Sequence, residues 1–139
     1  DDFANNLDRL RRKFESIRAA VPPPLAVYEP GARIGVVCCG TSLYATEESR
    51  DQLEREHGMK VSYMRLLAYP FNERLDEFID RHDRVYVVDQ NRDGQLCLLM
   101  RLDLTPERIL KLRSIRYYGG LPLDARTVTD EILHQESRS

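Results

Sequence analysis

The sequence has 139 residues and a mass of 16.2 kDa, a length that suits one domain with a single core. Hydrophobic residues make up 42% and charged residues 32%, which excludes disordered, collagen-like and rod-like coiled-coil chains. The formal net charge is -2, and no apolar run approaches the ~20 residues of a membrane span. We therefore expect neither nucleic acid nor a membrane as a partner, and we expect the protein to be cytoplasmic.

The first twenty residues are predicted to form an amphipathic helix. One apolar residue follows another at alternating steps of four and three, at Phe3, Leu7, Leu10, Phe14, Ile17 and Val21. Pro22-Pro23-Pro24 ends the helix and forms a stiff connector. The stripe must be covered, either because the helix packs back onto the domain or because it pairs with another chain, such as a second copy in a homodimer, or with missing sequence. Since the first residue is Asp1, we expect a fragment of a longer protein.

Residues 25–139 are predicted to form the main domain, after an N-terminal helix and connector over residues 1–24. Apolar runs typical of strands alternate with amphipathic runs typical of helices, which is the pattern of a parallel sheet with helical crossovers. The expected strands are a short edge strand at 26–28 and longer ones at 33–39, 60–67, 84–88 and 112–117. The continuous apolar sequence RIGVVCC at 33–39 is typical of a central strand that is buried on both faces.

Four helices are expected between and after these strands. They cover residues 43–57 with Gly58 as a left-handed cap, a segment capped by Asn72, a segment containing Leu96, Leu99 and Met100, and residues 124–134. Pro106 separates the third helix from the last strand. Beyond His134 we expect a polar, frayed end.

The cysteines and histidines give weak indications of chemistry. Cys38, Cys39 and Cys97 have neither the number nor the spacing of a disulfide framework or a zinc site, and we expect them to be buried, reduced strand residues. His57, His82 and His134 each fall near the end of an expected helix, where an imidazole can bind the terminal carbonyls. Ser42 follows a strand but lacks the GxSxG pattern of a nucleophile elbow.

Polar loops follow three of the expected parallel strands. The carboxyl ends of such strands share one edge of the sheet, where α/β proteins place their functional crevice. We therefore expect an interface or an anion-binding site there, formed by Gly40, Thr41, Ser42, Pro70, Phe71, Gln90, Asn91 and Gln95. The turn at 40–42 joins a buried strand to a helix N-terminus, which suits an anion, but one glycine and no P-loop lysine make this signal weak. In the turn at 89–95, Asp93 can cap the following helix, and the amides of Asn91 and Gln95 can satisfy a neighbour or cap their own loop.

The same loops carry a family resemblance. CCGTS after the first long strand, AYPFN after the second, VVDQNRDGQL after the third and RYYGGLPLDAR near the end resemble the C-terminal region of the alpha subunit of 2-oxoacid:ferredoxin oxidoreductases, especially 2-oxoglutarate synthases. The resemblance covers residues 9–134 and is most specific in QNRDGQL, at 90–96. It implies a transketolase C-terminal-like fold of three layers, α/β/α, with a five-stranded mixed sheet whose first strand is antiparallel.

The resemblance also implies a function for the whole enzyme. Such enzymes oxidatively decarboxylate a 2-oxoacid to an acyl-CoA and reduce ferredoxin, with thiamine diphosphate, magnesium and an iron-sulfur cluster. We expect this chain to bind none of these cofactors, to be inactive alone, and to have the other alpha-subunit domains and the beta subunit as partners, with ferredoxin and coenzyme A as partners of the whole enzyme. Two alternatives stay open: a free-standing small-ligand or anion-binding module that uses residues 40–42, and a pure protein-interaction domain.

Overall fold

Five strands form one mixed sheet that organises the rest of the chain. In the computed structural model, which describes residues 2–138, they are β1 (Leu25–Val27), β2 (Ile34–Cys39), β3 (Val61–Leu66), β4 (Arg84–Asp89) and β5 (Leu112–Arg116). Their order is β1-β3-β2-β4-β5, with β1 antiparallel to β3 and the other neighbouring strands parallel. This confirms the predicted α/β fold with a mostly parallel five-stranded sheet and an antiparallel first strand.

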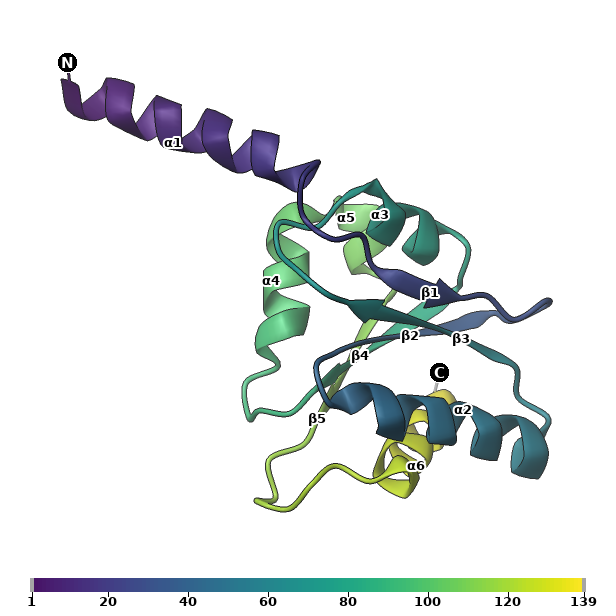
Figure 1. Ribbon diagram of the computed structural model, residues 1–139. Helices are drawn as coiled ribbons and strands as arrows, with labels where there is room; N and C mark the ends of the chain where they lie inside the picture. The colour runs from purple at the N-terminus through teal and green to yellow at the C-terminus, as the bar shows by residue number, and fades with distance from the viewer. Residues whose placement is uncertain (1, 139) are drawn as a thin grey trace.

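Helices cover both faces of the sheet and complete the three layers (Figure 1). One face carries α2 (Ser42–His57) and α6 (Ala125–Glu136); the other carries α3 (Glu73–Asp80), α4 (Gln95–Asp103) and the short α5 (Pro106–Ile109). Successive residues of a strand point to opposite faces, so in β2 Val36 and Cys38 belong to the α2/α6 core while Val37 belongs to the α3/α4 core. The central strands are apolar throughout because both of their faces are buried.

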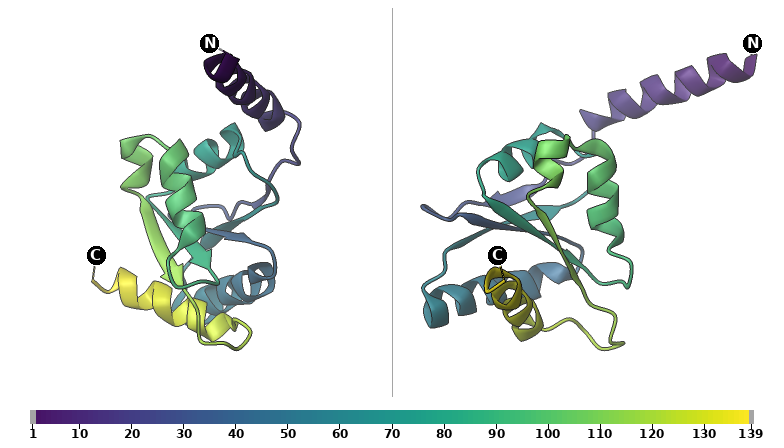
Figure 2. Two further views of the ribbon diagram at one scale, coloured as in Figure 1. Left: turned by 90° about the vertical axis from the view of Figure 1, so that its left-hand side faces the viewer. Right: turned by 180° about the vertical axis from the view of Figure 1, so that it is seen from behind.

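The helix α1 (Asp2–Arg18) projects away from this body (Figures 1 and 2). None of its described residues is buried, and the apolar side chains Phe3, Leu7, Leu10 and Phe14 are 72%, 51%, 54% and 47% exposed. The alternative that this helix packs back onto the domain is therefore wrong. Its last turns meet the body: the Phe14 ring lies 5.6 Å from the Tyr69 ring, and Arg18 reaches the loop that follows β3. Across residues 2–138, no helix is long and apolar enough to span a membrane.

Several helix ends follow the predicted chemistry. The side chain of Asn72 accepts a hydrogen bond from the amide of Arg74 at the start of α3, and Gly58 ends α2 with a left-handed φ of 63°. His82 is 3% exposed, and its Nδ1 donates to the carbonyl of Phe78 at 2.7 Å, in the last turn of α3. The expected capping role is confirmed for His82.

The end of α6 is anchored, which the sequence analysis did not predict. Both oxygens of Glu136 accept from the guanidinium of Arg84, at 2.6 and 2.5 Å, and Oε1 also accepts from the Tyr86 hydroxyl at 2.6 Å. Arg84 and Tyr86 lie on β4, a central strand, and Tyr86 is fully buried. The frayed end that we expected beyond His134 is therefore wrong as far as Glu136, because this carboxylate ties the last turn of α6 to the sheet.

Candidate functional site

The loops after β2 and β4 meet at the carboxyl edge of the sheet, as predicted. Gly40 turns the chain out of β2 with a positive φ of 56°, and α2 starts at Ser42. The side-chain amide of Gln90, directly after β4, donates to the Thr41 hydroxyl at 3.2 Å and to the Ser42 hydroxyl at 2.9 Å. Because β2 and β4 are neighbours in the sheet, this contact joins the two loops into one surface.

A buried carboxylate organises the turn between β4 and α4. Asp89 is 3% exposed, and its two oxygens accept from the backbone amides of Leu96 at 2.8 Å and Cys97 at 3.2 Å. Its Oδ1 also accepts from the side-chain amide of Asn91 at 3.0 Å. The negative charge therefore sits at the N-terminal end of α4, where free amides and the helix dipole favour it.

Asn91 and Gln95 differ in what they offer to a partner. The Oδ1 of Asn91 accepts from the backbone amide of Gln95 at 3.0 Å, so both ends of the Asn91 amide are used within the turn. Asp93, which was expected to cap α4, instead pairs with Arg92 at 2.7 Å, and Gly94 stands at the cap position with a φ of 67°. The side chain of Gln95 is exposed, and its amide is available to a neighbour.

Pro70 and Phe71 lie in the loop after β3, but their side chains are buried. Phe71 is 5% exposed and packs in the α3/α4 core. Six of the eight residues predicted at this edge belong to the two loops that meet there. Gln90 joins Thr41 and Ser42, which follow Gly40. Asn91 lies next to Gln90 in the chain and binds the backbone amide of Gln95. Phe71 instead lines a different cavity.

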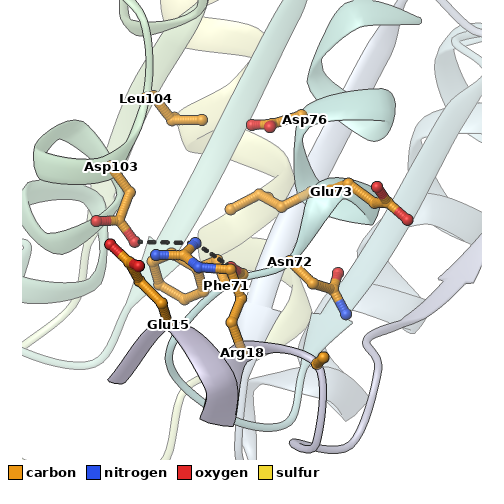
Figure 3. A pocket seen from close by; sticks show the side chains of 10 residues that line it. Glu15, Arg18, Phe71, Asn72, Glu73, Asp76, Asp103 and Leu104 are labelled. Atoms are coloured by element: carbon orange, nitrogen blue, oxygen red, sulfur yellow. Dashed lines mark hydrogen bonds and ion pairs between the residues drawn. The ribbon is translucent and has the colours of Figure 1, made fainter. Parts of the chain in front are cut away.

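That cavity, of about 400 Å³, lies between the last turn of α1, the start of α3 and the end of α4 (Figure 3). The guanidinium of Arg18 donates to the carbonyl of Phe71 and lies 3.8 Å from the carboxylate of Asp103. Glu15, Glu73 and Asp76 also line the cavity, so most of its charged lining residues are acidic. Burial raises the pKa of Asp76, and the nearby Arg108 opposes this shift. Sequence reasoning missed the cavity because its walls come from three segments that are distant in the chain.

The thiols and the serine at the edge are not activated for catalysis. Burial raises the pKa of Cys38 to about 11, and burial followed by the charge of Asp89 raises the pKa of Cys39. Ser42 accepts from Gln90, and in the part of the chain that the structure describes no histidine contacts it. All three cysteines are free, as expected, but Cys39 is exposed and Cys97 lies on α4, so the prediction of buried strand cysteines holds only for Cys38.

The described residues also provide no group of three or more histidines, cysteines or acids that could hold a metal ion. Cys38 and Cys97 are buried in the cores on opposite faces of the sheet, which does not fit a cluster held by four cysteines.

Comparisons with known proteins identify the fold. No protein-family model matches the sequence, and no curated protein matches it. Among solved structures, the chain is similar to part of the 2-oxoglutarate:ferredoxin oxidoreductase of Magnetococcus marinus, which was solved with 2-oxoglutarate, coenzyme A and succinyl-CoA bound. The TM-score is 0.78 at 23% sequence identity, over 95% of this chain and 23% of that one. The shared α/β fold with its mixed sheet fits the transketolase C-terminal-like domain that the sequence resemblance implied.

Proposed function

We propose that this chain is a supporting domain of the alpha subunit of a 2-oxoacid:ferredoxin oxidoreductase. The observation that carries the proposal is the likeness in fold over 95% of the chain to an enzyme of that activity. The sequence resemblance supports it independently, because two of the resembling segments, CCGTS and VVDQNRDGQL, meet at the carboxyl edge of the sheet. The chain spans 23% of the matched enzyme's chain, so the reaction belongs to a larger assembly.

In this proposal, the whole enzyme converts a 2-oxoacid such as 2-oxoglutarate to its acyl-CoA in the cytoplasm and reduces ferredoxin. Thiamine diphosphate supplies the chemistry that makes the decarboxylation possible, and it would be held by other domains together with magnesium and the iron-sulfur cluster. We expect this chain to provide none of the ligands of such a cluster. The role of this chain is to fold into a rigid body that positions the neighbouring domains.

The carboxyl edge of the sheet is the surface that we assign to that contact. The hydrogen bonds of Gln90 with Thr41 and Ser42 fix the loop after β2, and Asp89 fixes the start of α4. A surface that is ordered in advance loses less conformational entropy on association. The exposed side chains of Thr41, Gln90 and Gln95 can then exchange hydrogen bonds with the other alpha-subunit domains or with the beta subunit.

The test is an activity assay on the full gene product. The gene that encodes this chain is co-expressed with its neighbouring genes, the complex is purified through a tag, and the coenzyme A-dependent reduction of ferredoxin is measured with 2-oxoglutarate and with pyruvate. We expect reduction that requires a 2-oxoacid in the complex, and none from the 139-residue chain alone. A full gene product that copurifies with no second subunit and reduces no acceptor with either 2-oxoacid contradicts the proposal.

A further inference from the structure

The projecting helix α1 presents a narrow apolar stripe that is largely exposed to solvent. Leu7, Leu10 and Phe14 are roughly half exposed, although helices of soluble domains usually bury such a stripe. The stripe continues onto the body, because the Phe14 ring lies 5.6 Å from Tyr69, whose ring lies 5.0 Å from that of Phe71. Both views in Figure 2 show the helix pointing away from the domain. A partner in the angle between helix and body would touch both.

The spacing of the stripe points to a helix as the occupant. With Leu7 and Phe14 as a positions and Leu10 and Ile17 as d positions, the apolar residues follow a strict heptad, which is the pattern of a seam between two helices. Helices that lie on a membrane surface have a wider apolar face. Two acids, Asp8 and Glu15, lie at b positions on the polar face of the helix, and anionic lipids would repel them.

The charges beside the seam select the kind of helix. The flanking e and g positions hold Arg11, Lys13 and Arg18, together with the uncharged Ala4 and Asn6, and no acid. Among the described residues, Arg11 pairs with Glu15 of the same helix, at 3.4 Å between two highly exposed side chains, which contributes little.

A second copy of α1 is a poor match for this seam. In a parallel pair the g residue Lys13 would meet the e residue Arg18 of the other copy, and in an antiparallel pair e would meet e and g would meet g. Either arrangement offers only like charges or neutral contacts. The helix is also only about 25 Å long, so a self-paired seam would be short.

We propose that α1 docks an amphipathic helix of a partner protein or domain whose apolar seam is flanked by glutamate or aspartate. The opposite charges would face Arg11 and Lys13, while the apolar side chains of the partner cover Leu7, Leu10 and Phe14. This inference goes beyond the proposed function and does not rest on it, since it depends only on the stripe and its flanking charges.

The experiment uses the chain with two synthetic three-heptad peptides that have leucine at a and d. One peptide carries glutamate at e and g, and the other carries lysine there. Binding is measured by fluorescence anisotropy at low ionic strength, and the chain alone is examined by sedimentation. We expect the glutamate peptide to bind at least about tenfold more tightly than the lysine peptide, which corresponds to about 1.4 kcal/mol, and added salt to weaken the binding.

Three variants make the result specific. Leu10→Asp puts a charge in the seam and should weaken binding of the glutamate peptide by at least about tenfold. The matched control Asn5→Asp adds the same charge at an f position, opposite the seam, and should change little. The double variant Arg11→Glu with Lys13→Glu should reverse the preference between the two peptides. Because α1 has no buried residue, all of these variants should keep the fold of the body.

Each contrary outcome overturns the proposal. Equal binding of both peptides, or no binding of either, shows that Arg11 and Lys13 do not select an acidic partner helix. A dimer that Leu10→Asp dissociates shows that a second copy is the occupant. Flotation of the chain with phosphatidylserine-containing vesicles, without binding of the glutamate peptide, shows that the stripe meets a membrane instead.

Discussion

The side-chain amide of Gln90 donates to the hydroxyl of Ser42 across 2.9 Å, although 48 residues separate them in the chain. The contact exists because β2 and β4 are parallel neighbours, so that the loops after them leave the sheet at the same edge. The fold thus places two short polar turns against each other, and the side-chain amide of Gln90 donates its hydrogen bonds to the start of α2. Next to this contact lie Asn91, which holds the turn after β4 together, and Gln95, whose exposed side chain can bind a partner.

Asn91 and Gln95 should respond differently to truncation. Asn91→Ala removes a bond to Asp89 and the acceptor for the amide of Gln95, so we expect a loss of about 1 kcal/mol in the free energy of unfolding. Gln95→Ala should leave that free energy within about 0.5 kcal/mol, because its side chain is exposed. Urea unfolding of the isolated chain measures both.

The same two variants then test the proposed interface in the full enzyme. If the edge faces another domain or subunit, Gln95→Ala should weaken association by about 1–3 kcal/mol while the domain stays as stable as before. Copurification of the subunits gives the readout, and Arg92→Ala, at an exposed position of the same turn, is the control. If the Gln95→Ala variant assembles normally, Gln95 is not part of the interface.

The carboxylate of Glu136 should be worth more to stability than other charges on α6. Glu136→Ala leaves the guanidinium of Arg84 and the buried hydroxyl of Tyr86 without their acceptor, and we expect a loss of about 2–4 kcal/mol. Glu136→Gln keeps an acceptor and should cost less. Asp130→Ala, on an exposed position of the same helix, is the matched control for chemical unfolding. A loss no larger than that of the control would show that the end of α6 is not anchored.

This anchor also marks the limit of what the sequence could predict. The strands at 33–39 and 84–88 were predictable because both of their faces are buried, and a buried run is apolar without interruption. The meeting of Thr41 with Gln90 followed from the topology of parallel strands. The pairing of Arg84 with Glu136 did not, because nothing local in a polar helix end shows which residue 52 positions away it will meet.

The candidate site shows the same division. Asn72 could be predicted as a cap because capping is a local interaction within three residues. The capping of α4 by Asp89 was missed because its carboxylate binds the amide of Leu96, which lies seven positions further along the chain. The exposure of α1 could not be predicted either, since a heptad stripe shows that a surface has to be covered but not which surface covers it.

As the pH falls, His82 should destabilise the fold at a higher pH than the one at which the carboxylates become protonated. Burial lowers the pKa of His82 below its ordinary value of 6.5, and the hydrogen bond to the Phe78 carbonyl opposes this only in part. The unfolded chain therefore takes up a proton at a higher pH than the folded one, and stability falls as the pH drops below 6.5 towards the lower folded value. Above pH 6.5 both states are neutral at this position and the effect is absent.

The measurement is urea unfolding of the wild type and of His82→Asn on both sides of pH 6.5. The asparagine amide keeps a donor for the Phe78 carbonyl but does not titrate, so the variant should lose less stability on acidification than the wild type. Glu136 does not affect this comparison. Its pKa lies below the ordinary value of 4.5, so the stability that its carboxylate contributes is lost only at lower pH. An identical pH profile for the two proteins would show that His82 does not titrate differently on folding.

Gly35, the second residue of β2, should not tolerate even one added methyl group. A Cβ at this position would lie 2.6 Å from Cε1 and 2.9 Å from Cζ of Phe78, and 3.0 Å from Nδ1 of His82. Phe78 is fully buried, so its ring can yield only by disturbing the α3 side of the core, and we expect Gly35→Ala to cost about 1–3 kcal/mol. The double variant Gly35→Ala with Phe78→Leu should recover part of this loss beyond additivity, because the smaller side chain vacates the space. Chemical unfolding of the two single variants and the double variant gives the coupling energy, and strictly additive losses would show that the ring is not what excludes the methyl group.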